Sequence, residues 1–178
     1  MTEQLIIAGF GGQGVMSIGQ ILTYAGMTEK KEVSWLPSYG PEMRGGTANC
    51  NVIVSDKPVA SPIVTKATAG LMLNKPSLIK FENSVKEGGN LLINSSLIDI
   101  EATRDDINVY YIKANEIAVE LGNTRIANMV MLGAYLELTK VVSIDSVIEA
   151  LKKVLGKSKE HLIPINIQAM ERGAECVK

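Results

Sequence analysis

The chain has 178 residues, a formal net charge of −1 and a hydrophobic fraction of 46%, which suits one compact domain over residues 1–178. Basic and acidic residues balance, so the composition argues against a nucleic-acid or membrane partner. The first residues do not have the basic and apolar pattern of a signal segment, and no apolar run approaches the roughly 18 residues that a membrane helix needs. Its two cysteines are too few for the four ligands of an iron–sulfur cluster, and we expect a cytoplasmic protein with reduced thiols.

A glycine-rich turn follows the first apolar run. Leu5–Ala8 predicts a strand, and helical spacing from Val15 predicts a helix. The turn between them consists of Gly9, Phe10, Gly11, Gly12, Gln13 and Gly14. Glycine permits a positive φ and the close approach of another group, because it has no Cβ. The pattern is that of a dinucleotide-binding turn, or of a tight turn that packs a helix on a strand.

The second predicted strand, Glu32–Leu36, weakens the dinucleotide interpretation. Pro37 is expected to end this strand, because proline removes a hydrogen-bond donor from the ladder. A dinucleotide-binding unit uses Asp or Glu near the end of its second strand to bind the ribose hydroxyls. Here the strand ends with Leu36, Pro37 and Ser38, so a packing turn is favoured. A stand-alone dinucleotide-binding Rossmann protein remains the alternative.

The next segment combines loop residues with an aromatic side chain, an acid and an arginine. It consists of Ser38, Tyr39, Gly40, Pro41, Glu42, Met43, Arg44, Gly45 and Gly46. Its glycine and proline content predicts a loop. It is either a solvated surface connection or a recognition loop at the carboxyl ends of the strands, where open α/β sheets place their ligands.

The middle of the chain predicts four more strands: Thr47–Ser55, Ala69–Leu73, Leu91–Ile93 and Val109–Ile112. Asn74 is expected at the carboxyl end of the second of these. Pro76 suits the first turn of a helix that Gly88 and Gly89 are expected to end.

The last third has helical periodicity, with helices predicted at 114–121, at 126–136, after Ser143 and near Pro164. We therefore predict an α/β fold: a single Rossmann-like domain, with a mostly parallel sheet flanked by helices and a helical C-terminal third. His161, the only histidine, has no carboxylate or serine at catalytic spacing. Without a nucleophile elbow, a metal-spaced His and Cys cluster or a phosphate loop, the chain is expected to hold no catalytic residue and no metal site.

The glycine turn 9–14 and the segment 38–46, together with Asn74-Lys75-Pro76 and Pro164-Ile165-Asn166, resemble the gamma subunit of 2-oxoacid:ferredoxin oxidoreductases. The resemblance covers essentially the whole chain. It implies a component of a multisubunit enzyme that oxidatively decarboxylates a 2-oxo acid to an acyl-CoA and CO2 and passes electrons to ferredoxin. It leans toward the 2-oxoglutarate and 2-ketoisovalerate types, with an aryl-2-oxo acid relative as the alternative.

The resemblance also implies cofactors and partners. Thiamine diphosphate and magnesium belong between the alpha and beta subunits, and the iron–sulfur clusters belong to beta, delta or fused domains. This chain is expected to bind no cofactor by itself, to be inactive in isolation, and to contact alpha, beta and possible delta subunits, with ferredoxin an indirect partner. Its apolar, Met-rich composition would allow a homodimer when the partners are missing.

By the same analogy, the glycine turn and the 38–46 segment are expected on one edge of the sheet, near a neighbouring active site and the coenzyme A entry. Arg44 would pair there with a carboxylate or phosphate, while Glu42 and Tyr39 fix the loop. The alternative is that Arg44 only pairs with Glu42 or caps a strand end within the domain.

Overall fold

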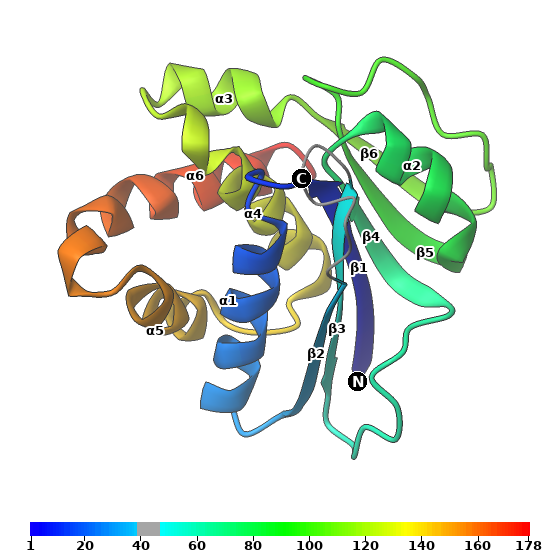
Figure 1. Cartoon of the computed structure of the whole chain (residues 1–178), viewed down its shortest axis with the longest axis horizontal. Coiled ribbons are helices and arrows are strands. Elements are labelled where there is room, and N and C mark those ends of the chain that lie inside the picture. Colours follow the sequence, from blue (N-terminus) through cyan, green and yellow to red (C-terminus); the bar gives the residue numbers. More distant parts are fainter. Residues whose placement is uncertain (39–46) are drawn as a thin grey trace.

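The computed structural model describes residues 1–38 and 47–178, which form one six-stranded sheet with helices on both faces (Figure 1). The strands are β1 (Thr2–Phe10), β2 (Glu32–Ser38), β3 (Thr47–Ser55), β4 (Ala67–Met72), β5 (Val85–Asn94) and β6 (Asn108–Ile112). The helices are α1 (Val15–Thr28), α2 (Lys75–Phe81), α3 (Ala114–Glu120), α4 (Ala127–Thr139), α5 (Ile144–Leu155) and α6 (Ile163–Glu175). Short 3-10 helices cover Glu82–Ser84, Thr124–Ile126 and Lys157–Leu162.

The strand order in the sheet is β2-β3-β1-β4-β5-β6. Strands β1, β4, β5 and β6 run parallel, whereas β3 is antiparallel to both of its neighbours, β1 and β2. The predicted mostly parallel α/β sheet is therefore confirmed, with one antiparallel strand inserted between the first strand and the second. Strand β3 has the bounds that the sequence predicts.

The central strand β1 is buried on both faces. Leu5 and Ile7 pack into the core beneath α1 and the C-terminal helices, while Ile6 and Ala8 pack into a smaller core beneath α2. This two-sided burial explains the unbroken apolar run, which is typical of central strands. Figure 1 shows α1, α4, α5 and α6 on one side of the sheet and α2 on the other.

The C-terminal helices confirm the predicted helical last third. Ser143 caps α5 by accepting a hydrogen bond from the backbone N–H of Ser146 at 3.2 Å, and Gly156 ends that helix. Helices α4 and α6 cross at glycines: a Cβ on Gly133 would lie 2.0 Å from the carbonyl oxygen of Met170. The two helix backbones therefore touch with no side chain between them.

Two local predictions are wrong. Pro37 does not end β2 but lies within it, opposite Cys50, because an edge strand tolerates a missing N–H. Gly88 and Gly89 do not end α2, which already stops at Phe81; they lie in β5. There the pairing with β4 shifts register between Ala67 and Ala69, so these glycines mark a β-bulge.

Candidate functional site

The crevice between the carboxyl ends of β1 and β4 is the topological switch point of the sheet. Strand β1 leads into α1 on one face, and β4 leads into α2 on the other. Open α/β sheets bind their ligands at such a point, because the two connections diverge and leave room at the sheet edge. The glycine-rich turn 9–14 lies here, as the sequence predicts for a turn between β1 and α1.

The side chain of Gln13 spans this crevice. Its Oε1 accepts a hydrogen bond from the backbone N–H of Phe10 at 2.6 Å, and its Nε2 donates to the carbonyl oxygen of Leu73 at 3.1 Å. The backbone N–H of Gln13 also donates to the carbonyl of Phe10 at 3.2 Å. Gln13 thus ties the end of β1 to the end of β4, in the place where a Rossmann turn would leave space for a pyrophosphate.

The glycines of the turn are required by close contacts. A Cβ on Gly9 would lie 2.6 Å from Gln13 Oε1 and 2.8 Å from the Cβ of Leu73. Gly14 has a φ of +80°, and a Cβ there would lie 2.3 Å from the Nδ2 atom of Asn128 on α4. These contacts support the interpretation as a turn that packs a helix on a strand.

The strand order gives a second reason against dinucleotide binding. In a nucleotide-binding Rossmann unit the second strand lies next to the first, so that its terminal acid reaches the ribose. Here β3 separates β1 from β2, and Glu32 aligns with Ser55 and Thr2 at the amino end of the sheet. The alternative of a stand-alone dinucleotide-binding protein is not favoured.

The register places both ends of the predicted recognition loop at the carboxyl edge. Ser38 pairs with Asn49, which pairs with Ala8, and Thr47 pairs with Phe10. Seven predicted site residues between these ends lie outside the described residues: Tyr39, Gly40, Pro41, Glu42, Arg44, Gly45 and Gly46. Their roles stay predictions.

A hollow of about 310 Å³ lies against the glycine turn. Its described lining residues are uncharged and include Phe10, Gly11, Gly12, Ser17 and Ala48. The Phe10 side chain is 41% exposed at this edge. The hollow can therefore receive an apolar or neutral group, but none of its described lining residues supplies a general acid or base.

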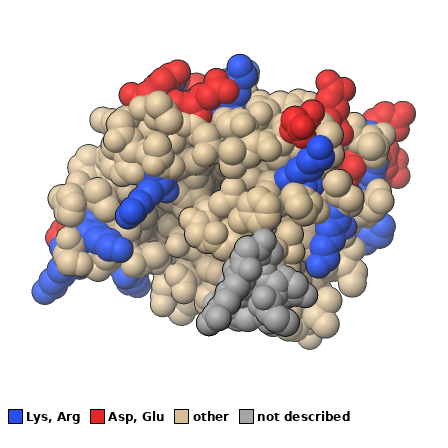
Figure 2. Space-filling view, turned by 45° about the horizontal axis from the view of Figure 1, so that its top comes forward, with Lys and Arg blue, Asp and Glu red and all other residues tan. Residues whose placement is uncertain are grey.

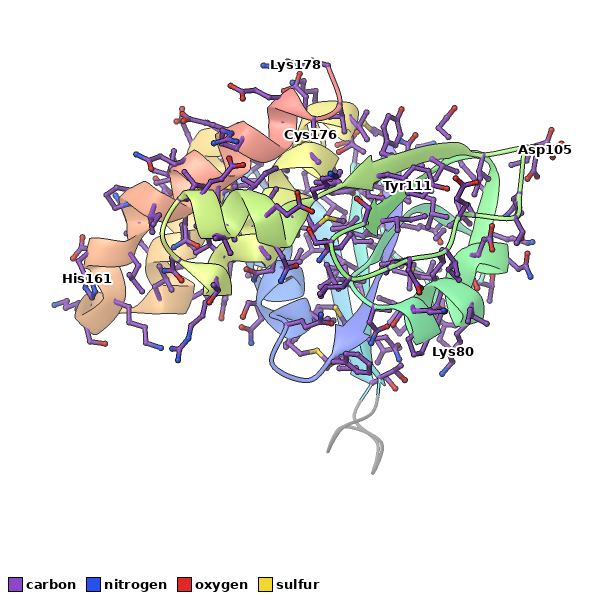
Figure 3. All side chains as sticks on the ribbon, turned by 90° about the horizontal axis from the view of Figure 1, so that it is seen from above. Lys80, Asp105, Tyr111, His161, Cys176 and Lys178 are labelled. Carbon is purple, nitrogen blue, oxygen red and sulfur yellow. The ribbon has the colours of Figure 1, made fainter. Side chains whose placement is uncertain are left out.

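On the face around this edge, the charged side chains lie mostly toward the margins (Figure 2). Figure 2 shows a broad uncharged area at the centre of the view, with Asp and Glu side chains gathered along its upper rim and Lys and Arg side chains at its left and right. Viewed onto the carboxyl edge in Figure 3, Asp105, His161 and Lys178 lie at the periphery. Protein interfaces are depleted of charged residues at their centres and polar at their rims, so this face has the composition of an interface.

The described residues provide no cluster of metal ligands. Within residues 1–38 and 47–178, no three His, Cys, Asp or Glu side chains are grouped to hold a metal ion. Cys50 is buried, and desolvation raises the pKa of its thiol to about 12, while Cys176 is exposed at the other end of the chain. His161 is exposed in the 157–162 segment. Across the same ranges, no helix is long and apolar enough to cross a membrane.

Three asparagines at this edge are missed by the sequence analysis: Asn94, Asn115 and Asn128. Asn94 ends β5, and its Nδ2 donates to the Oδ1 of Asn115 at the start of α3, at 2.7 Å. Asn94 follows a predicted strand just as Asn74 does, so the same rule could have found it. Asn128 lies inside a helical pattern, and nothing in its local sequence indicates its position against Gly14.

Comparisons with known proteins agree on one family. A family model described as pyruvate ferredoxin/flavodoxin oxidoreductase matches residues 4–176. The chain is 39% identical to ketoisovalerate oxidoreductase subunit VorA of Methanothermobacter marburgensis, over 97% of this chain but 36% of that relative. It is 34% identical to 2-oxoglutarate synthase subunit KorC of Methanocaldococcus jannaschii, over 100% of this chain and 95% of the relative.

Solved structures give the same result. The gamma subunit of a keto/oxoacid ferredoxin oxidoreductase from Geobacter sulfurreducens superimposes with a TM-score of 0.83 at 29% identity, over 98% of both chains. A 2-oxoglutarate:ferredoxin oxidoreductase from Magnetococcus marinus, with 2-oxoglutarate, coenzyme A and succinyl-CoA bound, superimposes with a TM-score of 0.89 at 25% identity. That match covers 99% of this chain and 31% of the longer chain.

Proposed function

We propose that this chain, which belongs to the pyruvate ferredoxin/flavodoxin oxidoreductase family, is the gamma subunit of a multisubunit 2-oxoacid:ferredoxin oxidoreductase. The complex would oxidatively decarboxylate a 2-oxo acid to an acyl-CoA and CO2, with the electrons passed to ferredoxin. The role of this chain would be structural: it would assemble the complex and shape the active site of a neighbouring subunit. The isolated chain would be inactive.

The observation that carries the proposal is the match of the whole chain to one part of larger enzymes. The similar region is 36% of the ketoisovalerate relative and 31% of the Magnetococcus chain, but 95% of the KorC relative. The same fold therefore occurs both as a short separate subunit and as part of a longer polypeptide. That distribution is expected of a module that works only beside the rest of its complex.

The residues present do not fit the cofactors of such an enzyme. Thiamine diphosphate is bound through a divalent cation that needs oxygen ligands, and clusters need cysteine thiolates. Within the two described ranges, no carboxylate or cysteine group of that kind occurs. The proposal therefore assigns thiamine diphosphate, magnesium and the iron–sulfur clusters to alpha, beta and delta subunits.

The surface that would meet those subunits is the carboxyl edge. Support comes from the exposed Phe10, from the uncharged residues described around the hollow beside it, and from the uncharged area at the centre of this face (Figure 2). Arg44 belongs to the segment between Ser38 and Thr47, and both of these flanking residues lie at this edge. We propose that Arg44 pairs with a carboxylate of a partner subunit or a phosphate of coenzyme A, and that Tyr39 and Glu42 fix the segment.

The substrate class follows from the relatives. The matching relatives named for ketoisovalerate and 2-oxoglutarate support a branched-chain 2-oxo acid or 2-oxoglutarate as the substrate of the complex. Both cysteines are free thiols, as is usual for proteins of the cytosol. We therefore place the complex in the cytoplasm.

The experiment is turnover in the assembled complex with wild-type chain or with Arg44→Ala, using 2-oxoglutarate, 2-ketoisovalerate and pyruvate in turn. We expect kcat/KM to fall about tenfold or more in Arg44→Ala, because a charge-assisted bidentate contact is lost. Arg172→Ala is the control, because Arg172 is an exposed arginine on α6 paired with Glu120. Normal turnover of an Arg44→Ala complex would show that Arg44 does not shape the active site, and would leave this chain with a scaffold role alone. Failure of the wild-type chain to join any complex would overturn the proposal itself.

A further inference from the structure

A second hollow at the carboxyl edge has a different chemistry from the one beside Phe10. It has a volume of about 160 Å³ and lies at the ends of β1, β4 and β5, below the start of α4. Its polar lining is supplied by Gln13, Asn94, Asn115, Thr124, Arg125 and Asn128. These side chains come from four separate segments of the chain, and the fold brings them to one place.

The charge that the described residues give this hollow is positive. Among its described lining residues, Arg125 carries the one charged side chain, and none is Asp or Glu. Within the part of the chain that the structure describes, Arg125 is exposed and its guanidinium takes part in no ion pair and no hydrogen bond. Its donors are therefore available to a ligand, and a guanidinium matches an oxyanion with two parallel hydrogen bonds.

The buried wall of the hollow carries further donors. Asn94 is 2% exposed, and its Nδ2 uses one N–H on the Oδ1 of Asn115 at 2.7 Å. An amide nitrogen has two N–H groups, and no described residue accepts the second. The Nδ2 group of Asn115 is likewise without an acceptor among the described residues. Asn115 is half-buried and Asn94 is buried, and each amide has an N–H group that can donate to a ligand in the hollow.

The backbone at the start of α4 adds positive electrostatic potential to this hollow. Ala127 and Asn128 are the first residues of this 13-residue helix, both line the hollow, and no side chain among the described residues caps the helix start. The positive end of the helix dipole favours an anion at this end.

We propose that this hollow is a binding site for a small oxyanion, held by the Arg125 guanidinium and by the amide groups of Asn94 and Asn115. Its ligand would carry one carboxylate or phosphate head group on a small body. The volume is below the roughly 300 Å³ at which pockets for larger organic ligands begin, so a dinucleotide does not fit. This inference does not rest on the proposed subunit role, since the site belongs entirely to this chain.

The test is an NMR titration of the full 15N-labelled chain at constant ionic strength, balanced with sodium chloride. The probes are 2-oxoglutarate, 2-ketoisovalerate and inorganic phosphate. We expect saturable shifts of the Arg125 Nε–H, of the Asn94 and Asn115 side-chain amides and of the Ala127 and Asn128 backbone amides. Saturation with a 2-oxo acid identifies a carboxylate site, and saturation with phosphate alone identifies a phosphate site; either result supports the proposal.

Two variants test whether binding depends on the residues of this hollow, and a third variant is the control. Arg125→Gln should weaken binding about tenfold or more, because a hydrogen bond to a charged group is lost. Asn115→Asp keeps the oxygen that accepts from Asn94 but adds a negative charge, so it should abolish binding. Arg172→Gln, on a distant surface, should change nothing. Shifts that never saturate with any probe, or that are the same in Arg125→Gln, would overturn the proposal.

Discussion

Gln13 donates a hydrogen bond from Nε2 to the carbonyl oxygen of Leu73, 60 residues further along the chain, at 3.1 Å. Its Oε1 simultaneously accepts from the backbone N–H of Phe10. One glutamine side chain therefore closes the switch point between β1 and β4 that other Rossmann-like sheets leave open for a nucleotide. The glycine turn of this chain is built around that side chain, since Gly9 has no room for a Cβ beside it.

Replacing Gln13 with alanine should lower the free energy of unfolding by about 1–2 kcal/mol, because two backbone groups lose their partner. Urea denaturation followed by circular dichroism measures the change. Gln168→Ala is the matched control, because Gln168 is exposed on α6 and should change stability little. Equal stability of the two variants would show that the Gln13 bridge contributes nothing.

Gly133→Ala should destabilise the chain by about 3 kcal/mol or prevent folding, because the new methyl group would enter the backbone of α6. Gly12→Ala is an informative comparison. Gly12 has a φ of +88° with open space around its Cβ position, so alanine there meets only backbone strain of about 1–2 kcal/mol. Thermal unfolding of both variants shows which substitution destabilises the chain more. A Gly133 variant as stable as the Gly12 variant would contradict the close helix crossing.

The segments that the sequence predicts correctly are those fixed by local chemistry. Strand β3 and the Ser143 cap of α5 follow from alternation and from capping, which depend on neighbouring residues. Gly88 and Gly89 suggest a helix end in the sequence but lie in a β-bulge, because both features favour glycine. The insertion of β3 between β1 and β2 depends on pairing between distant segments, which no local pattern records.

In the candidate site, too, the features set by local sequence are predictable and those set by distant contacts are not. The glycine turn is visible as a run of residues, and its position between β1 and α1 is predicted correctly. The role of Gln13 is not, because its partner Leu73 lies in another strand. Arg125 and Asn94 approach one hollow only through the fold, and neither carries a motif.

Glu82 should be important for the irregular segment before β6. This glutamate is 6% exposed, and its Oε1 accepts from the backbone N–H groups of Thr103 at 2.5 Å and Arg104 at 3.0 Å. Glu82→Ala should cost about 2–3 kcal/mol, because these two N–H groups and the Thr103 hydroxyl, which donates to Oε2 at 3.1 Å, lose a charged acceptor. Glu87→Ala, at an exposed glutamate in the β5 bulge, should have little effect. Limited proteolysis would show faster cleavage between 95 and 107 in the Glu82 variant alone.

Glu29 should make the contact between α1 and α5 sensitive to acid. Partial burial opposes ionisation of its carboxyl group, but hydrogen bonds from Ser143, including one from its backbone N–H at 2.6 Å, hold the pKa below the ordinary 4.5. A depressed folded-state pKa stabilises the fold at pH values above 4.5, and this contribution is lost as the pH falls through the folded-state pKa.

The measurement is the free energy of unfolding of wild type and Glu29→Gln between neutral pH and about pH 3. We expect wild type to be more stable at neutral pH and the difference to shrink as the pH falls below 4.5. Glu149→Gln is the control, because Glu149 is an exposed glutamate on α5. A difference between wild type and Glu29→Gln that stays constant with pH would contradict the assigned role of the carboxylate.

The most direct test of the subunit assignment is affinity purification of the tagged chain from its native cells. Mass spectrometry identifies what is bound, and an assay measures coenzyme A-dependent oxidation of 2-oxo acids in the purified material. We predict that thiamine-diphosphate-binding and cluster-bearing subunits co-purify and that the preparation oxidises a 2-oxo acid. A chain that purifies alone, shows no such activity and binds a nicotinamide or flavin dinucleotide would contradict the account.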